Sequence, residues 1–592
     1  MLRSKIEFKN EKPYILLDER AYSPLAYTTY FDECGEYSDF IKNGYRMFFV
    51  NISFSSLPIN NMTGFTPFLS GVFEGDIPDY SEFDNNVQRI LSLCSDALIF
   101  PRINISMPKK WIEKNPRETV VTANGGRRES LYSDVFLKDG AALLSKVIQH
   151  IKKASYAENI AGYQLCGGTT QEWFHHDLSG SFSDMGVEKY KFWLKEKYKA
   201  EDVILPEKEC FFSGEKASLY GEFCGEMTAK TVEFFAKALK DIIDGKQIVG
   251  VFYGYNAFVN DYLWGHHGLR FIIDSPYIDF FSSPCAYDNS RRLGSDWGDM
   301  LPALSLKTHK KLYFVECDIR TYLTRRMQDN RPGKYPEDIY PQYDENNNKT
   351  VWAGPDSCSL SVSSLRKAFS RQLTKGSGIW WFDMWGGWYH DEKIMDELRR
   401  MKDIFEMSEK KDTSAYPSSE VVMFIDEKAY LNYPRDSQLL HSVNILRLNM
   451  GNTGIPFDLC MVEDAQKVIK KYKAAIFTAP IPSDSGKEAV KLCESLCIPC
   501  IKVSPEKTFY SENELRSLLI EKGLHCYNKD GNVIYCGEGF IAVHAIKGGE
   551  VRILLPKKYT VRPLLGSDLT ERMTDELLIC MEEYDTAVFE LI

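Results

Sequence analysis

Short apolar runs alternate with amphipathic helical patterns through the first two-thirds of the chain. The runs are rich in aromatic and β-branched residues and predict eight strands, at 25–29, 45–52, 97–104, 160–166, 247–254, 278–284, 312–315 and 378–385. Between them, segments such as 135–153 repeat apolar residues at steps of three and four, which is one face of a helix. Eight strand–helix repeats predict a (β/α)8 TIM barrel over residues 1–408.

The pattern changes twice after the barrel. Residues 408–417 are polar and end in proline, which is typical of a linker. A second α/β unit follows over 418–525, with strands at 421–425, 474–478 and 498–503 and no Gly-x-Gly-x-x-Gly fingerprint of a nucleotide site. From 526 to 592, short alternating segments predict a small C-terminal antiparallel β-domain, taken as a β-sandwich.

Composition narrows the class of partner. The 592 residues are 44% apolar and 26% charged, which is ordinary for a globular protein, and the net charge of -11 argues against nucleic acid. Aromatic residues make up 13%, which fits rings that stack on sugars but equally fits a large aromatic core.

The first ten residues lack the apolar core of a signal peptide, and no run reaches the length of a membrane span. The 15 cysteines are an odd number and are scattered, as expected of free thiols. Together these features predict a cytoplasmic protein with no membrane partner.

The segment 312–320 places ionisable side chains directly after a buried strand. Residues 312–315 are apolar or aromatic, and Glu316, Asp318 and Arg320 follow at once. In an α/β barrel the working residues lie at the carboxyl ends of the strands. A carboxylate there, kept ionised by a nearby arginine, suits a nucleophile. We therefore predict Glu316 as the nucleophile; the alternative is a surface glutamate paired with Arg320.

The segment from Glu316 to Arg320 resembles the strand-seven nucleophile segment of bacterial β-galactosidase-like glycosidases. These are clan A enzymes near glycoside hydrolase family 42 and the related β-mannosidase family 164. The order of Pro108, Trp111 and Pro116 after strand three is also similar to family 42. The resemblance implies a retaining glycosidase without a cofactor, and a flavodoxin-like middle domain that builds a homotrimer.

Glycoside hydrolysis needs a second carboxyl group, and strand four faces strand seven across the mouth of a barrel. Glu172 is the only carboxylate between strand four and the pair His175–His176. Family 42 enzymes place an Asn-Glu pair directly after the strand-four glutamine, whereas here the glutamate arrives several residues later, behind Gln171. The neighbouring Trp173 and His175 would desolvate Glu172 and raise its pKa, as a general acid requires. The alternative is a glutamate at the start of a helix, without chemistry.

Further candidates for substrate binding are polar or aromatic residues at strand ends: Arg102 and Asn104 after strand three, Gln171, Trp173 and His175 after strand four, Tyr253 and Tyr255 after strand five, Tyr287 after strand six, Arg320 after strand seven, and Trp381, Asp383 and Trp385 on strand eight. The resemblance matches Tyr287 to the tyrosine that clan A enzymes place against the nucleophile. On strand eight, alternation sends only some of the three residues inward.

The pairs His175–His176 and His266–His267 suggest a metal, but adjacent residues make poor joint ligands, so no metal site is expected. The sequence thus predicts a retaining exo-β-glycosidase of the β-galactosidase or β-mannosidase type, acting on a small oligosaccharide or glycoside. Two alternatives stay open. One is a non-catalytic carbohydrate-binding barrel, and the other is an inverting hydrolase with carboxyl groups about 6.5–9.5 Å apart.

Overall fold

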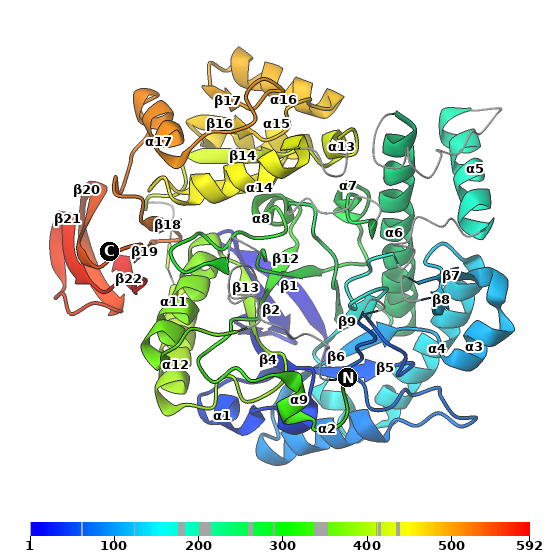
Figure 1. The fold of residues 1–592 in the computed structure, drawn as a ribbon. Coiled ribbons are helices and arrows are strands. Elements are labelled where there is room, and N and C mark those ends of the chain that lie inside the picture. The colour runs from blue at the N-terminus through cyan, green and yellow to red at the C-terminus, as the bar shows by residue number, and fades with distance from the viewer. Residues whose placement is uncertain are drawn as a thin grey trace.

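The computed structural model describes residues 2–60, 63–122, 125–175, 184–199, 215–257, 264–287, 291–336, 353–409, 411–412, 416–433 and 438–592. Parallel strands close into a barrel surrounded by helices (Figure 1). The barrel strands, in order around the ring, are β4 (Leu25–Thr29), β5 (Met47–Ser53), β6 (Leu98–Ile105), β9 (Gly162–Gly167), β10 (Ile248–Val251), β11 (Phe280–Pro284), β12 (Leu312–Cys317) and β13 (Gly378–Asp383). The predicted (β/α)8 barrel is confirmed.

The outer layer consists of helices whose apolar faces pack on the strands. The described helices of the barrel region are α1 (Tyr37–Lys42), α2 (Ser81–Leu93), α3 (Lys109–Lys114), α4 (Asp134–Lys153), α5 (Asp184–Tyr198), α6 (Glu215–Ile242), α7 (Leu269–Ile272), α8 (Ala303–Thr308), α9 (Met327–Asn330), α11 (Cys358–Lys375) and α12 (Glu392–Ser408). Helix α4 begins where the Ser133 side chain accepts a hydrogen bond from the Phe136 N–H, an N-cap. Leu144, Ile148 and Ile151 of its expected apolar face are fully buried.

The lower barrel interior is filled by aromatic rings. Phe49 of β5 contacts Phe100 of β6 and Trp380 of β13, with ring centroids 4.9 and 4.7 Å apart, and Phe314 of β12 completes the group. Because side chains alternate along a strand, residues two positions further on also point inward, toward the mouth. These positions are Arg102 on β6 and Glu316 on β12.

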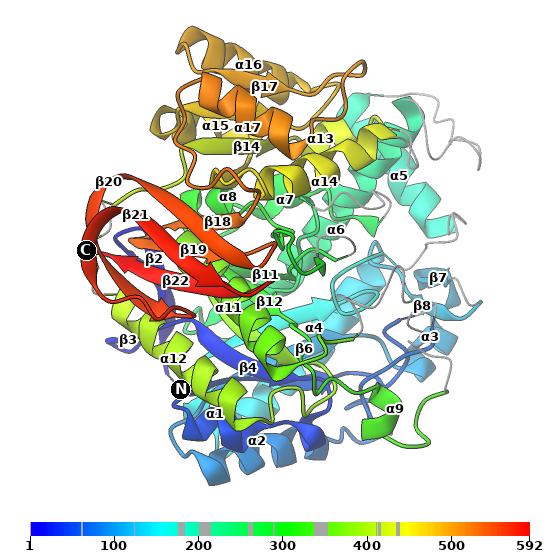
Figure 2. The same ribbon diagram turned by 60° about the vertical axis from the view of Figure 1, so that its left-hand side comes forward.

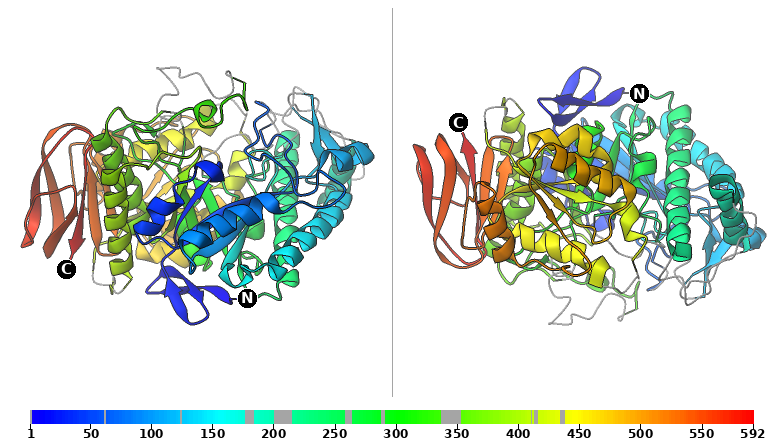
Figure 3. Two further views of the ribbon diagram at one scale, coloured as in Figure 1. Left: turned by 90° about the horizontal axis from the view of Figure 1, so that it is seen from below. Right: turned by 90° about the horizontal axis from the view of Figure 1, so that it is seen from above.

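A small N-terminal sheet closes the other end of the barrel. It consists of β1 (Ser4–Lys9), β2 (Lys12–Leu17) and β3 (Arg20–Tyr22), and no element was predicted here. The Ser4 N–H donates to the Lys246 carbonyl, and the Ile248 N–H donates to the Ser4 hydroxyl, both at 2.8 Å. The sheet therefore lies against the start of β10, at the end remote from the mouth, and projects from the barrel in Figure 3.

The middle domain is a parallel sheet in the order β15 (Phe457–Met461), β14 (Val421–Ile425), β16 (Ala474–Phe477), β17 (Cys500–Lys502). This is the start of the flavodoxin-like order 2-1-3-4, as expected. Its helices are α13 (Glu427–Tyr430), α14 (Gln438–Gly451), α15 (Ala465–Val468), α16 (Asp484–Ser495) and α17 (Glu512–Glu521). Strand β15 was not predicted because Asp458 interrupts its short apolar run.

The C-terminal strands are β18 (Val533–Gly537), β19 (Phe540–His544), β20 (Gly549–Leu565), β21 (Arg572–Met581) and β22 (Thr586–Leu591). They form one continuous antiparallel sheet (Figure 2), which confirms the predicted C-terminal antiparallel β-domain. A register shift in the long strand β20 lets the sheet curve, so that Ile534 and Ile541 pack with Ile553 and Leu577 in one core. The opposite face packs on α11.

None of the cysteines in the described part of the chain forms a disulfide. Among the described helices, none combines the length and the apolar character needed to span a membrane.

Candidate active site

Glu316 lies at the inner wall of the barrel mouth. It is next to last in β12, in register with Pro284 of β11 and Trp380 of β13. The residue is only 2% exposed, and its Oε2 has no hydrogen-bond partner among the described residues. An unpaired buried carboxylate oxygen is costly, so such a group points to a role in binding or chemistry.

Arg102 lies beside Glu316 in the same layer of the barrel. It is fully buried among the rings of Phe252 and Trp380, whose centroids lie 4.8 and 5.4 Å from its guanidinium carbon. None of its three nitrogen atoms has an oxygen or nitrogen partner among the described residues. Its positive charge is the largest influence that lowers the pKa of Glu316.

Glu172 returns to the end of strand β9 through a tight loop. Its backbone pairs in parallel with Gly167, the last residue of β9, and the Trp173 N–H donates to the Gly167 carbonyl at 2.7 Å. Thr170, Gln171 and Trp173 all have positive φ angles, of 58°, 70° and 62°. Such angles in non-glycine residues are strained and cluster at functional sites. The loop thus brings Glu172 back to the end of β9, although in the sequence it lies several residues beyond the position that family 42 enzymes use.

The carboxylate of Glu172 is held by two hydroxyl groups. Tyr255 donates to Oε1 and Thr170 to Oε2. Burial raises the pKa of Glu172 to about 7, although the hydrogen bonds from Thr170 and Tyr255 and the charge of Arg102 oppose that shift. A carboxyl group with this pKa can both give and take a proton near neutral pH.

The two glutamates act on each other electrostatically. Burial raises the pKa of Glu316 well above its ordinary value, and the charges of Asp318 and Glu172 raise it further, against Arg102 and Arg291. Neighbouring buried carboxyl groups cannot readily ionise together, so the charge of each glutamate disfavours ionisation of the other. Burial raises the pKa of Tyr30, which follows β4, well above its ordinary value; the charge of Arg102 opposes this shift, and the charges of Glu316 and Glu172 add to it.

Asp318 takes the partners that were expected for Glu316. Arg320 Nη1 lies 2.5 Å and Arg291 Nη2 2.6 Å from its carboxylate oxygens, and the Tyr287 hydroxyl donates to it at 3.1 Å. In the described structure Arg320 and Tyr287 thus contact Asp318, and their contact with the nucleophile stays a prediction. Positions 316 and 318 share one side of the chain, so the cluster still borders Glu316.

Strand β13 turns two of its predicted sugar-binding residues away from the mouth. Trp381 Nε1 donates to the Tyr45 hydroxyl at 3.0 Å, in the layer between β13 and α12. Asp383 accepts hydrogen bonds from the Tyr27 hydroxyl and the Trp388 N–H, both at 3.1 Å. The alternation of a strand that begins at Gly378 points Trp380 and Phe382 inward instead.

Three further candidates, Trp173, His175 and Tyr253, contact other parts of the protein in the described structure. Trp173 donates to the Leu165 carbonyl and packs on Phe235 of α6, and His175 stacks on Tyr132 at 4.3 Å. Tyr253 donates to the Gly265 carbonyl and stacks on a histidine of the following loop. Alternation along the chain after β10 sends Tyr253 and Tyr255 to opposite sides, and the Tyr255 hydroxyl donates to Glu172. The expected substrate contacts of Trp173, His175 and Tyr253 stay predictions.

The remaining candidates lie close to the mouth. Asn104 Nδ2 donates to the Ser53 hydroxyl at 2.9 Å, and its Oδ1 has no partner among the described residues. Gln171 is fully buried, and the described structure gives neither amide atom a partner. Trp385 packs on Tyr30 and Phe65, with ring centroids 6.2 and 5.4 Å apart.

Sequence reasoning missed Tyr30, Thr170 and Arg291. Tyr30 directly follows strand one, so the strand-end rule could have found it. Thr170 and Arg291 lie within loops whose folding no local pattern reveals. His176 lies outside the described residues.

One cluster of possible metal ligands occurs in the described part of the chain. Glu36, Asp39 and His390 bring their ligand atoms within 4.8 Å of one another. His390 is exposed, and its Nδ1 lies 2.7 Å from Asp39, an ordinary surface ion pair.

Comparisons with known proteins agree with this architecture. A β-galactosidase from Bacillus circulans superposes with a TM-score of 0.61 at 11% identity, over 96% of this chain and 99% of its own. A family 42 β-galactosidase from G. stearothermophilus gives 0.62 at 11% identity, over 99% and 100%. A family 42 exo-carrageenase from Bacteroides ovatus gives 0.60 at 12% identity, over 99% and 85%.

The chain shares the fold of the family 42 β-galactosidases. The similarity extends through all three parts of the molecule, so the resemblance seen in the sequence is confirmed at the level of the fold. No family model matches the chain, and no curated protein matches its sequence. The resemblance to family 164 stays a prediction.

Proposed function

We propose that this protein is a retaining β-glycosidase, with Glu316 as the nucleophile and Glu172 as the general acid/base. The observation that carries the proposal is the pair itself. Two buried glutamates lie at the ends of the facing strands β9 and β12. Glu316 has an oxygen without a partner in the described structure, and Glu172 has a pKa near 7. The shared fold with family 42 β-galactosidases supports it.

In the first step Glu316 attacks the anomeric carbon while Glu172 gives its proton to the departing oxygen. Arg102 favours the ionised form of Glu316 that this attack requires. The new ester bond removes the negative charge of Glu316. Glu172, which has given its proton to the departing group, is then the free carboxylate beside the ester and can take a proton from the incoming water. This is the exchange of roles that retention demands.

The pKa of Glu172 fixes the alkaline side of the expected pH profile. As an acid, Glu172 must be protonated, so glycosylation should decline as the pH rises through about 7. Replacing Glu172 by glutamine should remove this limb and reduce cleavage of substrates with poor leaving groups by about 10²–10⁴-fold.

The test is a panel of nitrophenyl β-glycosides with galacto, manno, gluco and fuco configuration. We expect the wild type to turn over one sugar, Glu316→Gln to be inactive, and azide to rescue Glu172→Gln by forming a glycosyl azide of retained configuration. A product of inverted configuration would instead assign an inverting hydrolase. A wild type that binds a sugar but cleaves none would make the protein a carbohydrate-binding barrel.

A terminal β-galactoside is the first substrate to test, because structures that share the fold are β-galactosidases; a β-mannoside is the second. The homotrimer and the cytoplasmic location also stay predictions. Light scattering at the mass of three 68.0 kDa chains would support the trimer, and a single monomer peak would refute it.

A further inference from the structure

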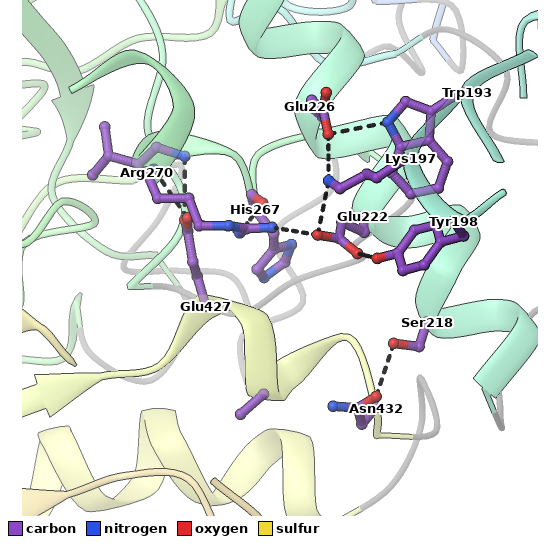
Figure 4. Close-up of polar contacts among 12 residues, drawn as sticks. Trp193, Lys197, Tyr198, Ser218, Glu222, Glu226, His267, Arg270, Glu427 and Asn432 are labelled. Atoms are coloured by element: carbon purple, nitrogen blue, oxygen red, sulfur yellow. Dashed lines mark hydrogen bonds and ion pairs between the residues drawn. The ribbon is translucent and has the colours of Figure 1, made fainter. Parts of the chain in front are cut away.

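A buried carboxylate of the middle domain reaches into a loop of the barrel. Glu427 begins α13 and is fully buried. Its Oε1 accepts hydrogen bonds from the backbone N–H and Nη1 of Arg270, both at 3.0 Å, and its Oε2 accepts from the Leu269 N–H at 3.2 Å. Leu269 and Arg270 begin α7, whose first N–H groups have no partner within the helix. One domain thus supplies the cap of a helix in another (Figure 4).

The loop held in this way leads directly to the general acid. His266 lies just before α7, and its Nδ1 accepts hydrogen bonds from the backbone N–H of Tyr255 at 3.1 Å and of Gly254 at 3.3 Å. Burial lowers the pKa of His266 to about 3, so the ring is neutral and Nδ1 is free to accept. Tyr255 in turn donates its hydroxyl to Glu172. A continuous series of hydrogen-bonded segments joins Glu427 to Glu172.

The loop has little room to move along α6. A Cβ added to Gly268 would lie 2.3 Å from the Gly225 carbonyl oxygen, and one added to Gly225 would lie 2.6 Å from that of His267. Such close backbone contact transmits a shift at the start of α7 to the whole loop.

A second carboxylate fixes the same arginine from the side of α6. Arg270 Nη2 also pairs with Glu222 at 3.4 Å, and Glu222 accepts from Lys197 and Tyr198 of α5 (Figure 4). Arg270 is therefore held between the middle domain and the helical pair α5–α6.

We propose that Glu427 is a positioning residue for the acid/base step. It holds α7 and the His266 loop so that Tyr255 keeps its hydrogen bond to Glu172. This proposal rests on the proposed function and adds that the middle domain takes part in proton transfer within its own chain. Loss of Glu427 frees the loop and weakens the bond from Tyr255, which favours the ionised form of Glu172. The pKa of Glu172 then rises, and the carboxyl group loses its orientation toward the leaving oxygen.

The experiment compares Glu427→Ala and the isosteric Glu427→Gln with Asp426→Asn as a matched control. Asp426 is the adjacent buried acid, but its carboxylate accepts from Ala429 and Ser483, both in the middle domain. Each full-length variant is assayed with a dinitrophenyl glycoside, which needs little proton assistance, and with the methyl glycoside of the same sugar, which needs much.

For Glu427→Ala we expect kcat on the methyl glycoside to fall about tenfold or more, because part of the rate gain from general acid catalysis is lost. On the dinitrophenyl glycoside, kcat should stay within about twofold. The alkaline limb should move to higher pH. Glu427→Gln should show the same pattern more weakly, and Asp426→Asn neither change. If Tyr255→Phe is combined with Glu427→Ala, the second change should add little, because both act through one bond.

Three results would overturn the proposal: equal losses on the two substrates, an unchanged alkaline limb, or the same pattern in Asp426→Asn. A purely structural role predicts the first and the third. Should Glu427→Ala not fold, Glu427→Gln together with Tyr255→Phe decides in the same way. Glu172→Gln separates the two proposals. If Glu172→Gln lowers kcat equally on the methyl and dinitrophenyl glycosides, the proposed function fails. If Glu172→Gln lowers kcat mainly on the methyl glycoside but Glu427→Ala does not, only the inference about Glu427 fails.

Discussion

Two adjacent strands, β12 and β13, carry buried acids near their ends whose side chains face opposite sides of the barrel wall. Glu316 on β12 faces the barrel lumen and leaves Oε2 without a partner in the described structure, whereas Asp383 on β13 faces the helices and accepts two hydrogen bonds. Burial raises the pKa of both groups, that of Asp383 to about 7. A raised pKa and burial at a strand end therefore do not identify a catalytic group. A buried polar atom that faces the lumen and lacks a hydrogen-bond partner in the described structure is a better indicator of a catalytic group.

Removing each carboxylate in turn tests most directly whether Glu316 and Asp383 differ in their effect on catalysis. Glu316→Gln should lower kcat by more than about 10³-fold, because in the proposed mechanism the Glu316 carboxylate forms the covalent bond to the sugar. Asp383→Asn, a matched amide substitution one strand away, should leave kcat within about twofold. Steady-state kinetics on the sugar that the wild type cleaves measures both. Comparable losses in the two variants would mean that the side chain's direction is not what separates them.

Removing Arg102 tests the charge beside Glu316. Arg102→Met keeps an apolar stem but loses the charge that lowers the pKa of Glu316, so that pKa should rise. A nucleophile must be ionised, and the acid limb of the kcat/KM profile should therefore move to higher pH by about one unit or more. Arg102→Lys retains the charge and should move the limb less. A limb that stays in place in Arg102→Met would show that another cation controls Glu316.

Asp383 should affect the pH dependence of the free energy of unfolding and not kcat. Its pKa is about 7 in the folded protein and about 4 in the unfolded chain, so the folded state binds more protons between these values. Wild-type stability therefore falls as the pH rises from about 4 to 7, by at most about 4 kcal/mol from this group. Asp383→Asn cannot ionise and should lose that part of the slope. Urea unfolding at several pH values measures it, and an unchanged slope would contradict the assignment.

The smallest effect is expected at Trp381. Trp381→Phe keeps most of the packing between β13 and α12 and loses one hydrogen bond, to the Tyr45 hydroxyl. The free energy of unfolding should fall by about 1 kcal/mol, with kcat and KM unchanged. A rise in KM would instead support the substrate-binding role first predicted for Trp381.

Much of the fold could be predicted because it depends on short-range patterns. Apolar runs at 25–29 and 312–315 mark barrel strands because a buried parallel strand must be apolar on both sides. The same reasoning located Glu316 one residue beyond such a run. The N-terminal sheet and β15 escaped prediction because short runs interrupted by charged residues carry little signal.

The contacts within the candidate site could not be predicted from local sequence patterns. The sequence by itself determined that a carboxylate follows strand seven and that Glu172 is the candidate after strand four, since composition and order are properties of the chain. Only the tertiary structure decided that the loop after Gly167 returns Glu172 to its strand, and that Asp318 takes Arg320 and Tyr287. Such partnerships join residues from different strands and loops, and their energy depends on distances that no local periodicity encodes.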